Sequence, residues 1–287
     1  IMPLIPKDLQ ILQMLADGEL KNTCWGIERN CNGIFLPEMA FSQSILPNLK
    51  ARGYSWTIID DEVFRIQYGG APFNRVAAIR GFKIFLRSNY WSNRISGGKF
   101  SFEEIRGKMN HEIPDWTKNQ PAYLIIAMDA ETFGHHHLHL IKNFLEPMVK
   151  EWGSEGENIL APIEEIGRIF PDESLIKIQD CSWATTEDDY WKDDPYPLWN
   201  SKFNPHHRNL WQLVNMALRH FGNPEANLDC LKITSSCQWW WISGRPRWEP
   251  GFMKFGARKA LEIIERHGSP KEISEAKKIF ERLIISK

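Results

Sequence analysis

The sequence lacks several features that would assign it to a common class. It has no apolar run of about 18 residues, the length that a membrane-spanning helix needs, and its first residues show no signal-peptide pattern. A glycine-rich phosphate loop, a Walker pattern and a nucleophile elbow are also missing, so nucleotide chemistry is not indicated. The net charge of −1 gives no reason to expect nucleic acid or a membrane as a partner.

Cysteine is scarce and irregularly placed. The five cysteines have no repeated spacing, which argues against a disulfide framework. Cys24 and Cys31 are seven positions apart, a separation that matches no common zinc-ligand pattern. We therefore expect reduced thiols and a cytoplasmic location.

Tryptophan, in contrast, is abundant, with 13 in 287 residues. Packing in a hydrophobic core accounts for part of this number. A flat apolar ring with one N–H donor also suits the C–H faces of pyranose sugars. The composition therefore favours a carbohydrate ligand.

The most informative stretch covers residues 122–139. It begins as an apolar run from Ala122 to Met128 and changes at once to Asp129, Glu131 and four histidines. An apolar run bounded by polar residues predicts a buried parallel strand. In α/β folds the chemistry gathers on the loops that follow the carboxyl ends of such strands. Asp129 is therefore the first candidate for a catalytic group.

The same pattern recurs earlier in the chain. Residues 33–41 contain a short apolar strand followed by Glu38, residues 44–52 predict a helix, and residues 54–61 predict a strand that ends in two aspartates. A further strand is predicted at residues 82–87. Strands and helices that alternate with short loops indicate βαβ units, so we expect a barrel-like parallel α/β fold.

The composition changes after residue 181. Residues 182–200 are aromatic, acidic and rich in proline, which indicates an ordered functional loop. Helices are then predicted at 208–221, at 225–242 and at 251–286, the last broken near residues 268–270. We expect a partial barrel over residues 1–200 and a helical domain over 201–287 that contributes aromatic side chains to the cleft.

Glu38 and Asp129 follow separate strands. If both strands belong to one parallel sheet, both carboxyl groups face the same edge, and a pair of carboxyl groups beside a cleft is what the hydrolysis of an acetal needs. The alternative is that each is an ordinary surface carboxylate or a loop cap.

The histidines admit a metal site as a second hypothesis. His135 and His139 are four residues apart, which on a helix directs both rings to one side, and Asp129 is close in sequence. The alternative is that these histidines cap a helix, line the cleft or bind sugar hydroxyls. Trp239, Trp240 and Trp241 would spread over a wide arc of a helix, so at most two of them fit one core.

In their order and spacing, several segments together resemble glycoside hydrolase family 57, the retaining enzymes that act on α-glucans. The resemblance extends from about residue 24 to residue 265. The segments that carry it are residues 33–41 and 53–61 (the nucleophile region), 85–87, 128–135 (the acid/base region), 236–243 (the aromatic region of the helical domain), and 182–183, 198–199, Asn204 and His206 (a loop of some members).

The resemblance implies a fold and a mechanism. The fold is α/β, an incomplete (β/α)7-type parallel barrel followed by a C-terminal helical domain. Glu38 would be the nucleophile and Asp129 the acid/base of a double displacement on α-1,4-glucan, with no cofactor and no metal. The expected partner is an α-glucan or maltooligosaccharide. The substrate-binding residues implied are Phe35, Arg87, Glu131, His135, His136, Trp183, Trp239, Trp240 and Trp241.

The sequence leaves several alternatives open. Amylase, 4-α-glucanotransferase and branching activities share the same two carboxylates and are not separated. A non-catalytic carbohydrate-binding remnant and a metal-dependent polysaccharide deacetylase remain as other classes, and the oligomeric state is undetermined.

The sequence also departs from the family pattern. Nothing before Gly33 resembles the family's His-x-His-Gln-Pro-like motif or its second motif, so we expect a C-terminal part of a longer protein, with an open sheet edge. Phe35, Pro37 and Ala130 replace the usual residues near the two carboxylates.

Overall fold

A computed structural model describes residues 32–285 except 118–119, 154–157, 222–227 and 246. The described residues form two compact units, one containing 32–39 and 55–179 and the other containing 40–54 and 180–285. The first is called the sheet unit below and the second the helical unit. The division at residue 200 stays a prediction from the sequence.

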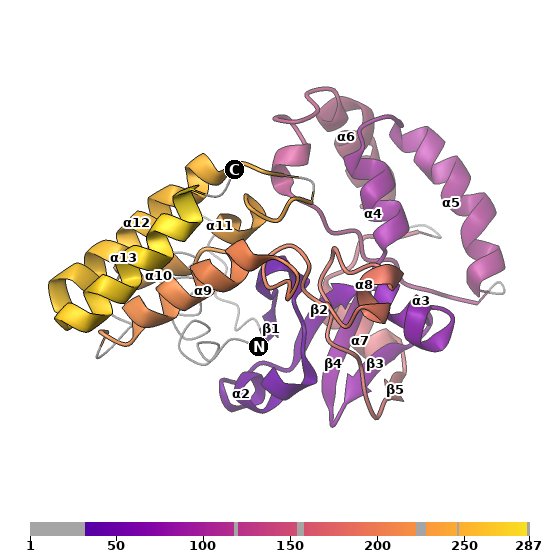
Figure 1. Ribbon diagram of the computed structural model, residues 1–287. Helices are drawn as coiled ribbons and strands as arrows, with labels where there is room; N and C mark the ends of the chain where they lie inside the picture. The colour runs from indigo at the N-terminus through magenta and orange to yellow at the C-terminus, as the bar shows by residue number, and fades with distance from the viewer. Residues whose placement is uncertain (1–31, 118–119, 154–157, 222–227, 246, 286–287) are drawn as a thin grey trace. The chain divides into compact units, whose positions relative to one another are not determined.

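The sheet unit is built on one five-stranded sheet (Figure 1). The strand order is β1-β2-β4-β3-β5, and all neighbours are parallel except β3 and β4. The strands are β1 (Gly33–Ile34), β2 (Trp56–Asp60), β3 (Val76–Ile79), β4 (Phe82–Arg87) and β5 (Asp172–Ser174).

The central strands are apolar because both of their faces are covered. In β2 the residues from Thr57 to Asp60 are buried, and in β4 only Lys83 is partly exposed. β1 pairs with β2 at Gly33 and Trp56, and a Cβ atom on Gly33 would lie 2.0 Å from the Trp56 ring. Only glycine therefore fits under that ring at the edge of the described sheet.

The sequence did not predict β3. It is joined to β4 by a two-residue turn in which Arg80 and Gly81 have φ angles of 51° and 77°. Positive φ at both positions is the geometry of tight hairpin turns whose twist matches that of the strands. The short run Val76–Ile79 is buried throughout, and so it carries no alternation to signal a strand.

The strand expected before Asp129 is only partly formed. Residues 122–128 contain a single parallel bridge, from Ile125 to Arg87, and no longer strand pairing. This corrects the expectation of a full buried strand. β3 pairs with β4 only from Phe82 to Ile84, so the segment joins β4 at its last residue and has no ladder to continue.

Helices cover the sheet unit and form a second cluster of buried residues around Trp91, Phe102 and Phe144. The helix that ends at Trp152 begins as a π-helix. The elements are η1 (Pro37–Met39), α3 (Glu62–Tyr68), α4 (Asn89–Ser96), α5 (Phe102–Thr117), η3 (Ala130–Thr132), η4 (Ile141–Leu145), α6 (Glu146–Trp152) and α7 (Ile163–Ile169).

The helical unit has its core between α9, α12 and α13, which pack on one another. The predicted break near residue 268 is confirmed: Ser269 caps α13 through reciprocal hydrogen bonds with Glu272. The elements are η2 (Gln43–Ile45), α2 (Leu46–Ala51), α8 (Glu187–Trp191), α9 (Pro205–Leu218), α10 (Leu228–Thr234), α11 (Cys237–Trp240), α12 (Pro250–His267) and α13 (Pro270–Ile285).

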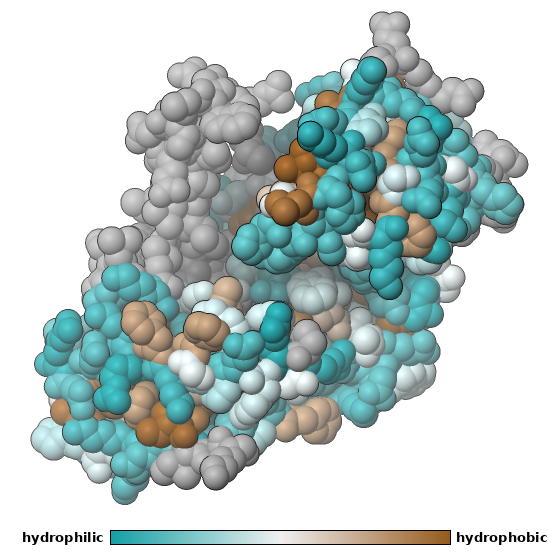
Figure 2. Space-filling model, turned by 90° about the horizontal axis from the view of Figure 1, so that it is seen from above, coloured by the Kyte–Doolittle hydropathy of each residue, from teal (hydrophilic) through white to brown (hydrophobic). Residues whose placement is uncertain are grey.

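The face in Figure 2 is mainly hydrophilic, with smaller hydrophobic groups between the polar side chains. Within the described ranges, no helix has both the length and the apolar character needed to cross a membrane.

Candidate active site

The parallel strands of the sheet unit bring the two predicted catalytic segments to the same end of the sheet, beyond the carboxyl ends of the strands. β1, β2 and β4 run in the same direction, and Ile125 bridges Arg87 in parallel as well. Glu38 comes four residues after Ile34, the last residue of β1, and Asp129 comes four residues after Ile125. Both carboxylates therefore follow the carboxyl ends of parallel segments, where α/β folds place their functional groups.

Glu38 lies in a short turn with an unusual backbone. Its φ and ψ angles are 57° and 19°, and the φ angle of Met39 is 46°. Left-handed backbone is costly for residues other than glycine and gathers at functional sites. The turn is closed by a hydrogen bond of 2.9 Å from the Met39 amide to the Leu36 carbonyl. The Glu38 side chain is half-buried, and nearby Phe35 is 56% exposed.

Asp129 has an ordinary extended backbone and precedes the short helix η3. Its carbonyl accepts a hydrogen bond of 3.0 Å from the Thr132 amide, which starts the turn. Its carboxylate makes no capping bond to that turn, and the residue is exposed. The carboxylate is thus not committed to capping η3.

Behind this end of the sheet lies a buried ion pair between Arg87 and Asp60. The Arg87 Nη1 atom is 2.6 Å from Asp60 Oδ2, and the two side chains are 5% and 1% exposed. Burial raises the pKa of Asp60, while the Arg87 charge and hydrogen bonds from Glu62 and Asn89 oppose that rise. Burial also raises the pKa of Asp61 to about 7.

The predicted histidine cluster turns out to be spread along the loop. His137 Nε2 lies 3.1 Å from the Ser96 carbonyl oxygen, and His139 Nε2 lies 2.9 Å from that of Gly98. These two histidines therefore fasten the loop to the end of α4. His136 is 3.5 Å from Glu131, and both are exposed, as is His135.

The residues do not fit a metal centre. In the part of the chain that the structure describes, no group of three or more histidine, cysteine, aspartate or glutamate side chains is placed to hold a metal ion. The convergence of Asp129, His135 and His139 that the deacetylase hypothesis requires is therefore not found.

The predicted sugar-binding tryptophans belong to the helical unit and differ in exposure. Trp239 is 0% exposed and stacks on Trp211 with ring centres 3.9 Å apart, so it is a core residue in this structure. Trp240 and Trp241 are half-buried, as expected if at most two of the three fit one core. Trp183 is also half-buried and packs against that core.

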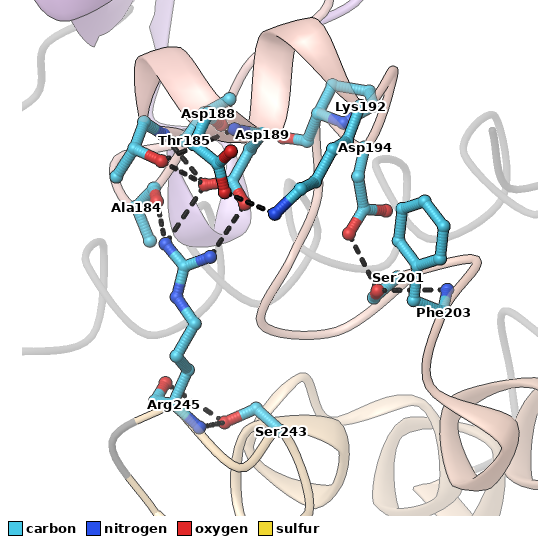
Figure 3. Close-up of polar contacts among 12 residues, drawn as sticks. Ala184, Thr185, Asp188, Asp189, Lys192, Asp194, Ser201, Phe203, Ser243 and Arg245 are labelled. Atoms are coloured by element: carbon cyan, nitrogen blue, oxygen red, sulfur yellow. Dashed lines mark hydrogen bonds and ion pairs between the residues drawn. The ribbon is translucent and has the colours of Figure 1, made fainter.

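An ion pair that the sequence did not predict links two aromatic segments of the helical unit (Figure 3). Arg245 donates to both oxygens of Asp189, with distances of 2.6 and 2.9 Å, and to the Ala184 carbonyl at 3.3 Å. It thereby joins the loop containing Trp183 to the segment after Trp241. In the sequence, Asp189 and Arg245 are 56 residues apart, and no spacing rule connects two charged residues at that separation.

The fold is that of an α/β protein in which the two candidate carboxylates follow parallel segments. Residues 1–179 match the family model of glycosyl hydrolase family 57, and the chain belongs to that family. No curated protein matches the chain.

Solved structures share the fold. The 4-α-glucanotransferase from Thermococcus litoralis has 14% identity and a TM-score of 0.62 over 92% of this chain and 46% of its own. The GH57-type branching enzyme from Pyrococcus horikoshii has 14% identity and a TM-score of 0.52 over 95% and 66%. The α-amylase AmyC from Thermotoga maritima has 11% identity and a TM-score of 0.58 over 97% and 67%.

These comparisons confirm the predicted fold class, an incomplete (β/α)7-type parallel barrel followed by a helical domain. The chain spans less than half of the length of the glucanotransferase and about two thirds of the other two proteins.

Proposed function

We propose that the chain carries the catalytic carboxylates of a retaining glycoside hydrolase or transglycosylase that acts on α-1,4-glucan. Membership of glycosyl hydrolase family 57 supports the reaction class. The similar structures are a glucanotransferase, a branching enzyme and an amylase, which supports an α-glucan or maltooligosaccharide as the substrate.

The observation that carries the proposal is the parallel pairing of the segments before Glu38 and Asp129, which puts both residues beyond the same end of the sheet. Glu38 attacks the anomeric carbon while Asp129 gives its proton to the departing glycosidic oxygen, and a glycosyl ester forms on Glu38 as the glycosidic bond breaks. Asp129 then takes a proton from water or from an acceptor hydroxyl, whose oxygen displaces Glu38. Both groups return to their starting state.

The strand order makes the stereochemistry a demanding test. Two strands, β2 and β4, separate β1 from the Ile125 segment, so the two segments are three strand spacings, or about 14 Å, apart in a flat sheet. A retaining mechanism needs carboxyl groups about 5–5.5 Å apart and an inverting one about 6.5–9.5 Å. The curvature of the sheet and the reach of the side chains have to close this gap.

The experiment follows maltooligosaccharide cleavage by NMR and identifies the anomer formed first. Retention supports double displacement, and inversion overturns it. Glu38→Gln and Asp129→Asn are each expected to lower the rate by about 10²–10⁴-fold or more. Glu103→Gln, which changes an exposed carboxylate on α5, is the matched control and should leave the rate unchanged.

Two other outcomes have a clear meaning. Binding of a maltooligosaccharide without turnover, equally tight in Glu38→Gln, would favour a carbohydrate-binding remnant. If turnover is found, the chain length and branch content of the products formed from amylose separate amylase, glucanotransferase and branching activity.

A further inference from the structure

We propose that Arg87 is a positioning residue for Asp129, in place of the direct substrate contact that the family resemblance implies. This inference rests on the proposed function, because it assigns a task to Arg87 in the step that Asp129 performs. It concerns only the sheet unit.

The hydrogen-bond partners of Arg87 argue against direct contact with a substrate. Its Nη1 donates to Asp60 at 2.6 Å, its Nη2 to Asn93 Oδ1 at 2.9 Å, and its Nε to the Ala127 carbonyl at 2.7 Å. The residue is 4% exposed. All three guanidinium nitrogens thus have protein acceptors, and the planar group is held in one orientation.

Asp60 is itself fixed, so Arg87 rests on a rigid support. Asn89 Nδ2 donates to both Asp60 oxygens, at 3.0 and 3.1 Å, and the Glu62 amide donates to Oδ1 at 3.2 Å. Asn93 in turn donates to Asn89 Oδ1 at 2.9 Å. Arg87 and Asp60 are buried, Asn89 is half-buried and Asn93 is exposed, and each of these side chains has a partner in the network. Such a network holds the geometry of its buried members.

The segment before Asp129 depends on this network because it has no strand ladder. The Ser88 amide donates to the Ile125 carbonyl at 2.8 Å, and the Ala127 amide donates to Ser92 Oγ at 3.2 Å. Arg87 Nε donates to the other backbone polar group of that residue, the Ala127 carbonyl. Ala127 lies two residues before Asp129, so the hydrogen bond from Arg87 fixes the position of the backbone from which the Asp129 side chain extends.

The consequence for catalysis is specific to proton donation. A displacement of about 1 Å in a reacting group costs on the order of 10²-fold in rate. Misplacing Asp129 should slow the cleavage of bonds whose leaving group needs a proton, while a leaving group that departs unprotonated is little affected. Loss of a direct sugar contact would instead raise KM and slow both kinds of substrate alike.

The test uses Arg87→Lys, which keeps a positive charge beside Asp60 but lacks the Nε–H donor. Asn93→Ala, which removes the acceptor of Nη2 and the donor to Asn89 Oδ1 but leaves Arg87 itself in place, is a milder second variant if Arg87→Lys does not fold. Lys83→Met is the matched control: Lys83 also lies on β4, near its opposite end, and also joins an aspartate (Asp172, 2.7 Å) and a backbone carbonyl (Gly167, 2.6 Å).

The first readout is kinetic and compares a maltooligosaccharide with α-maltosyl fluoride. Arg87→Lys should lower kcat on the oligosaccharide by about 10²-fold with KM changed less than about twofold. It should change kcat/KM for the fluoride, which reports only the first step, by less than about threefold. Asp129→Asn should give the same selectivity and Lys83→Met none. An equal loss on both substrates with a raised KM overturns the positioning role and restores the direct contact.

The second readout does not need activity. Backbone amide exchange in residues 122–132 should become about tenfold faster in Arg87→Lys and stay unchanged in Lys83→Met. Unchanged exchange in Arg87→Lys overturns the inference. If Glu38→Gln and Asp129→Asn keep full activity, the proposed function fails, and exchange still decides whether Arg87 holds this segment.

Discussion

Glu38 and Met39 show how the site is built into the backbone at the scale of single residues. Two consecutive residues with side chains hold left-handed φ angles directly after Pro37. Each such residue costs about 1–2 kcal/mol relative to ordinary backbone. The fold keeps this cost at the position proposed for the nucleophile, which agrees with a turn selected for where it directs the carboxylate.

Replacing Glu38 by glycine and by alanine separates the backbone cost from the chemistry. Both variants lack the carboxylate and should be inactive. Glu38→Gly should be more stable than Glu38→Ala by about 1 kcal/mol, because glycine adopts positive φ without a steric penalty. Urea unfolding measures the difference.

The same pair of substitutions at Glu103, in helix α5, serves as the control. There glycine should be less stable than alanine by about 1 kcal/mol, the usual helix penalty. An alanine variant at position 38 that is as stable as the glycine variant would contradict the strain argument.

Individual residues also show how far the site could be predicted from the sequence. The pattern of apolar strand and terminal carboxylate was enough to select Glu38 and Asp129 as candidates. It did not indicate that Arg87 is buried among Asp60, Asn93 and Ala127, because these partners come from separate elements. A buried arginine and a substrate-binding arginine have the same appearance in the sequence.

Among the larger elements, the aromatic segment after residue 181 is ordered by its own polar side chains. Thr185 Oγ1 donates to the Pro195 carbonyl at 2.6 Å, and Ser201 Oγ donates to Asp194 at 2.6 Å. Asp189 completes a capping box with Thr186 at the start of α8 and binds Arg245 (Figure 3). The prediction of an ordered loop is therefore supported by a physical cause.

We expect Asp189→Asn to loosen this loop. Burial alone would raise the pKa of Asp189, but hydrogen bonds from Arg245 and Thr186 hold it below its usual value. Asparagine keeps an acceptor for the cap and loses the charge, so stability should fall by about 1–2 kcal/mol, with Arg245 partly exposed. Limited proteolysis within residues 182–204 should become faster.

The adjacent Asp188 offers a matched control, because its carboxylate pairs only with the exposed Lys192 among the bonds in Figure 3. Asp188→Asn should change stability by less than about 0.5 kcal/mol. Equal effects of the two substitutions would show that the Arg245 link does not hold the loop.

Regular elements were predictable to different degrees for a clear reason. α12 and α13 were expected with their break, because helical spacing and a glycine-proline signal lie in adjacent residues. β3 was not expected, and the short strand that the apolar residues 175–179 predict lies instead at residues 172–174, as β5. Neither has enough residues to show a period, and their pairing depends on β4 and on each other.

At the scale of the whole molecule, the chain passes from one unit to the other more than once. Residues 40–54 belong to the helical unit although they lie between β1 and β2 in sequence. Phe41 pairs with Cys181, and Tyr196 donates to the Phe41 carbonyl at 2.9 Å. Contacts of this range are set by tertiary packing.

The two units should respond to pH in opposite directions between about pH 4 and 7. In the sheet unit the pKa of Asp61 is about 7, so the folded form keeps a proton that the unfolded chain releases near pH 4. Stability of this unit falls as pH rises through that window, by up to about 1.4 kcal/mol per pH unit. The raised pKa of Asp60 acts in the same direction.

In the helical unit, burial lowers the pKa of His207 to about 4. Its Nε2 lies 3.0 Å from the Trp239 carbonyl oxygen, and its Nδ1 accepts from the Ser201 amide at 3.1 Å. Below about pH 6.5 only the unfolded chain takes up the proton, so stability is lost as pH falls towards 4.

Urea unfolding with oxidative labelling and peptide-level mass spectrometry would follow each unit separately across this range. Asp61→Asn should flatten the response of the sheet unit and leave that of the helical unit as it is. Parallel pH responses of the two units would contradict both assignments.

The sequence by itself determined the family, the class of fold, the main helices and the two carboxylates that follow the strands. These properties depend on the local spacing of residues and on motifs whose members are close together in the sequence. Only the tertiary structure decided that Arg87 is buried against Asp60, that Trp239 is a core residue, and that the Asp129 segment has no ladder. Each of these depends on which distant residues come into contact, and burial and hydrogen bonding are properties of the folded chain.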